Sequence, residues 1–207
     1  GAGFCVFNDL AVCANRLIGE AQADRVLIID CDVHQGDGTA SLTAGRDDIF
    51  TFSIHAEKNF PVRKARSSLD VGLPDGTGDG DYLAVLDAHL PRLLDNFAPD
   101  IVLYQAGVDP HANDKLGRLA LSDAGLERRE RYVVDAVRSR RVPLASALGG
   151  GYGEDQREVA GRHARSMIAM ASENARHAAP ASNRYPRSPS GNRTTRTRAA
   201  GSSAGSA

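Results

Sequence analysis

The stretch "VLIIDCDVHQGDG", residues 26 to 38, changes from purely apolar to densely charged at Asp30. Its first four side chains are branched and aliphatic. An unbroken apolar run of this kind is typical of a strand that is buried on both faces of a parallel sheet. Three aspartates and one histidine then fall within the eight positions from Asp30 to Asp37. The stretch therefore predicts a buried strand with a polar site at its carboxyl end.

The rest of the chain repeats this strand pattern and alternates it with helical spacing. Further apolar runs rich in β-branched residues lie at residues 49–55, 101–107 and 142–148. Apolar stripes with helical periodicity are expected at residues 8–18, 86–97, 122–141 and 154–171. We expect Pro91 to kink or split the second of these helices. Alternating strands and helices predict a three-layer α/β/α domain with a mainly parallel sheet.

Composition limits the possible classes of protein. The chain has 207 residues, of which 42% are hydrophobic and 25% charged, as in an ordinary globular domain, which we place at residues 1–171. Residues 172–207 are of low complexity and are expected to form a disordered tail. The net charge of −1 and the absence of a basic face argue against direct binding to nucleic acid.

No sequence feature points to a membrane or to secretion. No apolar run approaches the roughly 18 residues of a membrane span, and no secretory signal is visible. The three cysteines, Cys5, Cys13 and Cys31, have no paired spacing, which fits a reducing compartment. We therefore expect a cytoplasmic protein. The sequence indicates no oligomeric state.

Chemically active side chains follow three of the four expected strands. Asp32 and His34 follow the first, Asp109 follows the run 101–107, and a glycine triplet with Tyr152 follows the last. The carboxyl ends of parallel strands meet at one edge of a sheet, where ligands bind. Two carboxylates and one imidazole form a three-ligand site for a divalent metal such as zinc, with a position left for water that titrates near neutral pH. Tyr152 could donate a hydrogen bond to a developing oxyanion.

Simpler interpretations of these residues stay open at this point. Aspartates at strand ends are often solvated turns or helix caps, and Asp30 and Asp37 could satisfy backbone amides around the turn at residues 36–38. The segment "GTGDG" at residues 76–80 does not follow an expected strand, so we interpret it as a loop and not as a dinucleotide fingerprint. A D-x-D site for a metal and a nucleotide would also need a loop that holds phosphate, and none is evident. No G-x-S-x-G motif or cysteine–histidine pair indicates a covalent nucleophile.

The chain resembles the histone deacetylase superfamily in four segments: "GFCVFNDLAVCA", "VLIIDCDVHQGDG", "DIVLYQAGVDPHANDKLGRLALSDAGLERRE" and "RRVPLASALGGGYGED". That superfamily includes acetoin-utilisation-type deacetylases and acetylpolyamine amidohydrolases. The segments "DVHQG" and "SRRVP" are most similar to those of class IV deacetylases and their bacterial relatives. The resemblance covers residues 1 to about 170 in order. It implies the arginase/deacetylase fold and a zinc-dependent hydrolase, with Fe²⁺ as an alternative metal. The implied substrates are acetylated lysine in proteins or an acetylpolyamine.

The resemblance also implies roles for individual residues. By position, Asp32, His34 and Asp109 match the metal ligands of the family, and Tyr152 matches the tyrosine that polarises the substrate carbonyl. The carboxylates of Asp30 and Asp37 match those that orient two active-site histidines. A structural K⁺ or Na⁺ is implied at Asp30, Asp32, His34 and Ser53. The acyl channel is implied at Phe4, Gly150 and Gly151.

The tandem histidines of the family lie a few residues before "GFC", and this chain begins at Gly1. They act as general base and acid, and acid–base catalysis usually contributes about 10²–10⁴-fold to the rate. We therefore expect this polypeptide to be nearly inactive by itself. The alternative is a non-catalytic relative that binds acylated amines or metal without turnover.

Overall fold

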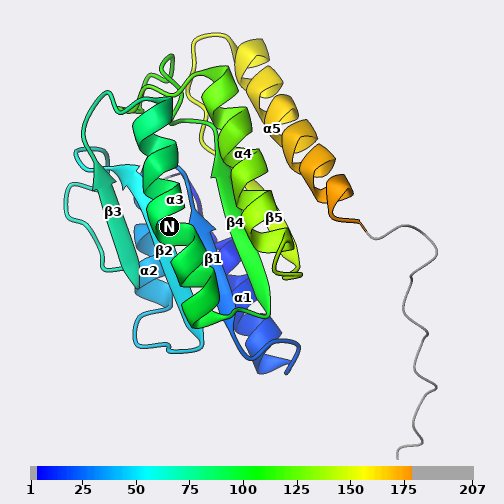
Figure 1. Cartoon of the computed structure of the whole chain (residues 1–207). Coiled ribbons are helices and arrows are strands. Elements are labelled where there is room, and N and C mark those ends of the chain that lie inside the picture. The colour runs from blue at the N-terminus through cyan, green and yellow to red at the C-terminus, as the bar shows by residue number, and fades with distance from the viewer. Residues whose placement is uncertain (1–3, 179–207) are drawn as a thin grey trace, which may run out of the picture.

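A computed structural model describes residues 4–178 of the 207-residue chain, as a parallel sheet covered by helices on both faces (Figure 1). The sheet has five strands in the order β3-β2-β1-β4-β5, and every neighbouring pair is parallel. The strands are β1 (Val26–Asp30), β2 (Ile49–Ala56), β3 (Leu69–Leu73), β4 (Ile101–Gly107) and β5 (Leu144–Gly149). The helices are α1 (Asp9–Gly19), α2 (Asp37–Leu42), α3 (Asp79–Phe97), α4 (Asp123–Arg138) and α5 (Gln156–Arg176). The predicted α/β fold class is confirmed.

Strand β1 is the centre of the molecule. All five of its residues are buried, because β2 and β4 pair with its two edges and helices cover both faces. Leu27 and Ile29 belong to the larger hydrophobic cluster, which α3 and α4 complete, whereas Val26 and Ile28 belong to a smaller cluster beneath α1. The unbroken apolar run of the sequence therefore reflects two cores, one on each face. It delivers Asp30 and the residues after it to the carboxyl edge of the sheet.

The helix starts follow the capping residues of the sequence. Asn8 caps α1 by accepting a hydrogen bond from the N–H of Ala11, and Ser122 caps α4 in the same way through Gly125. We expected Pro91 to kink or split this helix. A split is wrong, because α3 runs through this residue without interruption, and the kink stays a prediction. Proline removes only one backbone donor, and Leu86 and Leu94 stay buried on either side of it.

Two elements were not expected, and one is longer than expected. Strand β3 and the short helix α2 lie in segments that we had left without structure. The last helix, α5, continues to Arg176 instead of ending near residue 171. The remainder of the expected tail, residues 179–207, lies outside the described residues. No helix in the described part of the chain is long and apolar enough to cross a membrane.

A fully buried ion pair on α4 ties two strand ends together. The guanidinium of Arg129 donates to the carbonyl oxygens of Cys31, at 3.1 Å, and Gly107, at 2.8 Å. It also contacts the carboxylate of Glu130, which accepts a hydrogen bond from the hydroxyl of Tyr104. Neither side chain of the pair is exposed to solvent. The pair therefore fixes the spacing of β1 and β4 directly behind the polar edge of the sheet.

The change Arg129→Met should lower the free energy of unfolding by about 3–5 kcal/mol, because it leaves the Glu130 carboxylate buried without its partner. Chemical unfolding in urea measures this loss. The matched control is Arg128→Met at the neighbouring position, where a 57% exposed side chain pairs with Asp79. A surface pair contributes about 1 kcal/mol or less. Equal losses in the two variants would contradict the role assigned to the buried pair.

Candidate metal centre

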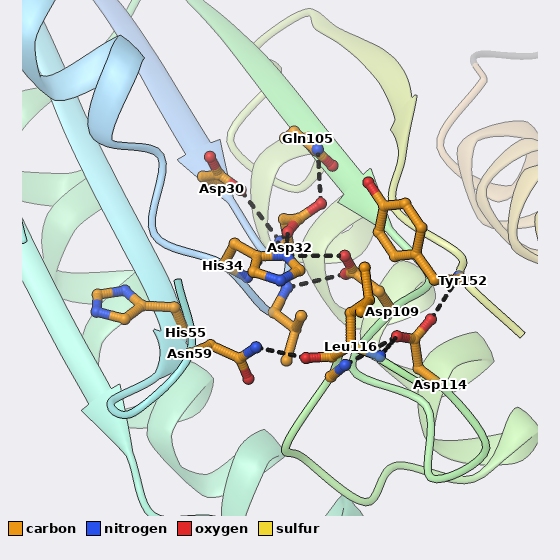
Figure 2. A network of polar contacts seen from close by, with 12 residues as sticks. Asp30, Asp32, His34, His55, Asn59, Gln105, Asp109, Asp114, Leu116 and Tyr152 are labelled. Atoms are coloured by element: carbon orange, nitrogen blue, oxygen red, sulfur yellow. Dashed lines mark hydrogen bonds and ion pairs between the residues drawn. The ribbon is translucent and has the colours of Figure 1, made fainter. Parts of the chain in front are cut away.

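The structure brings Asp32, His34 and Asp109 together at the carboxyl edge of the sheet (Figure 2). Asp32 and His34 directly follow β1, and Asp109 lies two residues after β4. The Nδ1 atom of His34 is 3.0 Å from Oδ1 of Asp32 and 3.2 Å from Oδ2 of Asp109. The three potential ligand atoms lie within 4.8 Å of one another. Side chains from the segments that follow β1 and β4, 75 positions or more apart in the chain, thus converge on one point.

Backbone and side-chain donors hold these carboxylates in place. Oδ1 of Asp109 accepts a hydrogen bond from the N–H of Val33 at 2.9 Å, and Oδ1 of Asp32 accepts one from the N–H of His34 at 2.9 Å. The amide of Gln105, on β4, donates to the other oxygen of Asp32 at 3.1 Å. The orientation of both carboxylates is therefore set by the protein itself.

The electrostatics of the site favour a positive charge between the carboxylates. Burial, together with the charge of Asp32, raises the pKa of Asp109 to about 7. Burial opposes protonation of His34, but its contacts with Asp109 and Asp32 outweigh burial and raise the pKa of His34 to about 10. Burial and the charge of Asp32 also raise the pKa of Asp30 well above its ordinary value. Without another cation, the protonated imidazole compensates the acidic groups.

The residues fit a divalent metal ion. Oδ2 of Asp109 is fully buried and accepts no hydrogen bond from the described residues, although it faces His34. The separations of 3.0 and 3.2 Å are near the distance of about 3.3 Å between ligands of a tetrahedral zinc with bonds of about 2.0–2.1 Å. Two carboxylate oxygens and one imidazole nitrogen suit a borderline divalent ion, to which His34 would bind in its neutral form.

The glycine-rich loop after β5 places Tyr152 beside these ligands. Gly150 and Gly151 have φ values of +61° and +98°, which side-chain-bearing residues rarely adopt. A Cβ atom at Gly150 would overlap the Asp109 carboxylate. The ring of Tyr152 lies edge-on to His34, with 6.3 Å between ring centroids. Burial, followed by the charges of Asp32 and Asp109, raises the pKa of Tyr152, so the phenol keeps its proton at neutral pH.

Asp30, Asp37 and Ser53 surround the ligands in different ways. Asp30 is buried and accepts a hydrogen bond from the N–H of Asp32 at 3.1 Å. Asp37 begins α2 and lines the cavity in front of the site. Ser53 pairs with Asp30 across β1 and β2, and its hydroxyl lies 3.0 Å from Nδ1 of His55. A monovalent cation at Asp30, Asp32, His34 and Ser53 stays a prediction.

A cavity of about 1160 Å³ opens in front of the candidate ligands. Phe4 and Gly150, both expected in an acyl channel, line it, and the ring of Phe4 lies 5.7 Å from that of Tyr152. The expected role of Gly151 in the channel stays a prediction, since this residue does not line the cavity itself. Its backbone instead faces Val159 and Val108 on the inner side of the loop. The cavity also reaches Asp32 and Tyr152.

The interpretation of "GTGDG" needs a correction. Strand β3 ends at Leu73 and α3 begins at Asp79, so the segment does follow a strand and open a helix. The first turn of α3 nevertheless carries Asp79 and Asp81. These carboxylates compete with a phosphate for the positive end of the helix dipole. Asp79 is occupied by Ser122, which donates to it through both its N–H and its hydroxyl. A nucleotide site therefore gains no support.

A second group of potential ligands lies at the C-terminal ends of α4 and α5. Asp135, Glu173 and His177 bring three ligand atoms within 4.8 Å of one another. His177 already contacts Asp135 at 2.9 Å, and Glu173 already accepts a hydrogen bond from Arg176 at 3.1 Å. Because these side chains already pair with one another or with Arg176, we use the group as a control and not as a second candidate centre.

The fold and the site together define an α/β protein with a candidate metal centre at the carboxyl edge of a parallel sheet. A family model described as "Histone deacetylase domain" matches residues 1–169. The chain belongs to this family, as the four sequence segments predicted.

Individual relatives agree with this assignment. An uncharacterized protein of Picosynechococcus sp. is 47% identical over 163 residues, which are 79% of this chain and 54% of that protein. Histone deacetylase 2 of Arabidopsis thaliana is 33% identical over 155 residues, covering 73% of this chain and 40% of that protein. The crystal structure of an acetylpolyamine aminohydrolase from Burkholderia pseudomallei matches with a TM-score of 0.68 and 26% identity, over 83% of this chain and 51% of that chain. The chain thus spans about half the length of these relatives.

Proposed function

We propose that the protein is a zinc-dependent deacylase that hydrolyses the amide between an acetyl or related acyl group and an amine. The amine is the ε-nitrogen of lysine in a protein or the nitrogen of a polyamine, as the names of the relatives suggest. Membership of the histone deacetylase domain family supports the reaction. The observation that carries the proposal is the convergence of Asp32, His34 and Asp109, whose potential ligand atoms lie within 4.8 Å of one another.

In this proposal Asp32, His34 and Asp109 hold the ion. When bound, zinc supplies Lewis acidity toward the amide carbonyl and lowers the pKa of a water molecule. The phenol of Tyr152 donates a hydrogen bond to the carbonyl oxygen as negative charge develops on it. Asp30 fixes the backbone N–H of Asp32, and Asp37 stands at the cavity wall where it can orient a proton-transferring group.

The pair of histidines that the family resemblance implies for proton transfer is absent from the described cavity. All six histidines of the chain lie within the described residues, and only His34 lines the cavity. The rate of amide hydrolysis by a polypeptide limited to residues 1–207 should therefore be about 10²–10⁴-fold lower than that of a protein that also carries a general base and acid. The same observation favours a second candidate function, a non-catalytic protein that binds zinc and acylated amines.

Several finer assignments belong to the same proposal. Fe²⁺ could replace zinc, because imidazole and carboxylate ligands suit both ions. We propose a structural K⁺ or Na⁺ near Asp30 and Ser53. We also propose a cytoplasmic protein without direct contacts to nucleic acid or membranes, which the three free cysteines and the net charge of −1 support.

The proposal is tested on the full-length gene product, with an acetyl-lysine peptide and an acetylated diamine as substrates. We expect release of acetate that stops on treatment with a chelator and returns when zinc is added. Saturable binding of either substrate without release of acetate would instead support the non-catalytic function. Zinc-independent turnover, or neither binding nor turnover, would refute both.

A further inference from the structure

The backbone of Tyr152 is bound at both of its polar groups by one loop of the chain. Its N–H donates to Oδ2 of Asp114 at 2.7 Å, and its carbonyl oxygen accepts a hydrogen bond from the N–H of Lys115 at 3.4 Å. Figure 2 shows the phenol of Tyr152 on the side of Asp32 and Asp109, with its backbone linked to Asp114 behind it. The position of the phenol thus depends on a residue that does not itself reach the ligands.

The other oxygen of Asp114 stabilises the loop that contains Asp114 itself. Oδ1 accepts hydrogen bonds from the N–H groups of Leu116 and Gly117, each at 2.8 Å. Asn59 adds a further contact to this loop, because its amide donates to the carbonyl oxygen of Leu116 at 2.6 Å. The loop also packs against the backbone of the candidate ligand Asp109, since a Cβ atom at Gly117 would overlap the carbonyl oxygen of Asp109. Asp114 therefore connects the loop that carries the phenol to the segment that carries a ligand.

The glycine-rich loop itself contributes no side chain that could hold the phenol in place. Between the end of β5 and Tyr152 the chain has only Gly150 and Gly151, so no side chain there can anchor the turn. Both have positive φ values, in a region that glycine enters without steric cost. The carboxylate of Asp114 is used completely, with both oxygens accepting from backbone N–H groups of the two loops.

We propose that Asp114 is a positioning residue that holds the phenol of Tyr152 against the reacting carbonyl. This inference rests on the proposed deacylase function and adds to it a residue outside the ligand set. A misplacement of about 1 Å at a reacting group can cost about 100-fold in rate. The loss should therefore appear in kcat and not in the binding of zinc.

The decisive variant is Asp114→Asn in the zinc-loaded, full-length gene product. An amide side chain has a single oxygen acceptor, so it cannot serve both loops, and its NH₂ group opposes one of the N–H donors. We expect kcat to fall by about 10- to 100-fold, with KM within about twofold and zinc content unchanged. Asp114→Glu, which restores two oxygen acceptors on a longer side chain, should recover part of the lost kcat.

The matched control is Asp100→Asn at the opposite edge of the sheet. Oδ2 of Asp100 also joins two segments, by accepting hydrogen bonds from the N–H groups of Asp24 and Arg25 at 2.9 and 2.8 Å. This variant loses a comparable loop contact far from the candidate centre and should keep its kcat. A loss of kcat that equals that of Asp114→Asn would overturn the inference, because it would reflect general loosening of the protein.

A double-mutant cycle with Tyr152→Phe tests whether Asp114 acts through the phenol. If it does, Asp114→Asn should add little to the loss already caused by Tyr152→Phe, because coupled residues are not additive. Independent, multiplying losses would refute the positioning role. So would an Asp114→Asn protein that has lost its zinc.

Amide hydrogen exchange separates this inference from the proposed function. Asp114→Asn should accelerate exchange at residues 150–154, whereas Asp100→Asn should do so only around residues 24–25. If the parent protein has no deacylase activity but shows this exchange pattern, the proposed function fails and the positioning of Tyr152 by Asp114 stands. Unchanged exchange at residues 150–154 overturns the inference whatever the activity.

Discussion

Asp109→Asn should lower the affinity of the protein for zinc by about 100-fold or more, a larger effect than losses at residues that only support metal ligands. The amide oxygen can still accept the hydrogen bond from the N–H of Val33, so the main change is the loss of an anionic ligand. The measurement is thermal unfolding with and without zinc. At a zinc concentration about 100 times its dissociation constant, the parent protein gains about 2.7 kcal/mol, and the variant should gain almost nothing.

Two comparisons make this result specific. Asp135→Asn removes a member of the second group of potential ligands and should leave the stabilisation by zinc intact. Asp109→Ala should lose zinc as well, but it should also destabilise the metal-free protein because it leaves the buried N–H of Val33 without an acceptor. Zinc that binds with unchanged affinity to Asp109→Asn would show that the ligand set is assigned wrongly.

Tyr152→Phe should reduce kcat of the full-length gene product by about 10²–10³-fold, the usual cost of removing one donor to a developing oxyanion. Zinc content should not change, because the hydroxyl is not among the candidate ligands. KM should change little, since the lost hydrogen bond strengthens mainly in the transition state. Steady-state kinetics with an acetyl-lysine peptide, together with metal analysis, measures these quantities.

The control for this change is Tyr132→Phe. Its hydroxyl also donates to another side chain, Asp87 at 2.8 Å, but this contact joins α4 to α3 and does not line the cavity. We expect its kcat to stay within about twofold of the parent value. A Tyr152→Phe protein that retains more than about a tenth of the parent kcat would argue against oxyanion stabilisation by this phenol.

The elements that the sequence predicted are those whose burial follows a simple period. Strand β1 could be predicted because both of its faces are covered, which makes the run at residues 26–29 continuously apolar. Strand β3 escaped detection because it is a short edge strand that carries Asp70 and Gly72. Helix α2 has only six residues and includes a glycine, so it has no visible apolar stripe.

The convergence of the three candidate metal ligands was predictable for a topological reason. Asp32, His34 and Asp109 all come just after strands, and neighbouring parallel strands deliver such residues to the same edge. The supporting residues have no such marker. Gln105 gave a weak signal, because it is a single polar side chain inside the apolar run of β4.

Other supporting residues depend on contacts that no local pattern specifies. Asp114 acquires its role only when two loops meet, 38 positions apart in the chain. Arg129 and Glu130, by contrast, occupy the buried stripe of α4 between Leu126 and Val133. Charged residues on an otherwise apolar helix face were a signal that could have revealed the buried ion pair.

The parallel pairing of β1 and β4 has a consequence for the stage of folding at which the proposed zinc ion would bind. The N–H of Val33 and the carboxylate of Asp109 meet across 76 positions, whereas Asp32 and His34 are near neighbours in any conformation. In a newly made or denatured polypeptide, only two of the three candidate ligands, Asp32 and His34, therefore lie close together. Complete chelation has to wait for the slow, long-range alignment of parallel strands. Zinc should therefore stabilise the native state and not the folding transition state. It should slow unfolding without accelerating refolding.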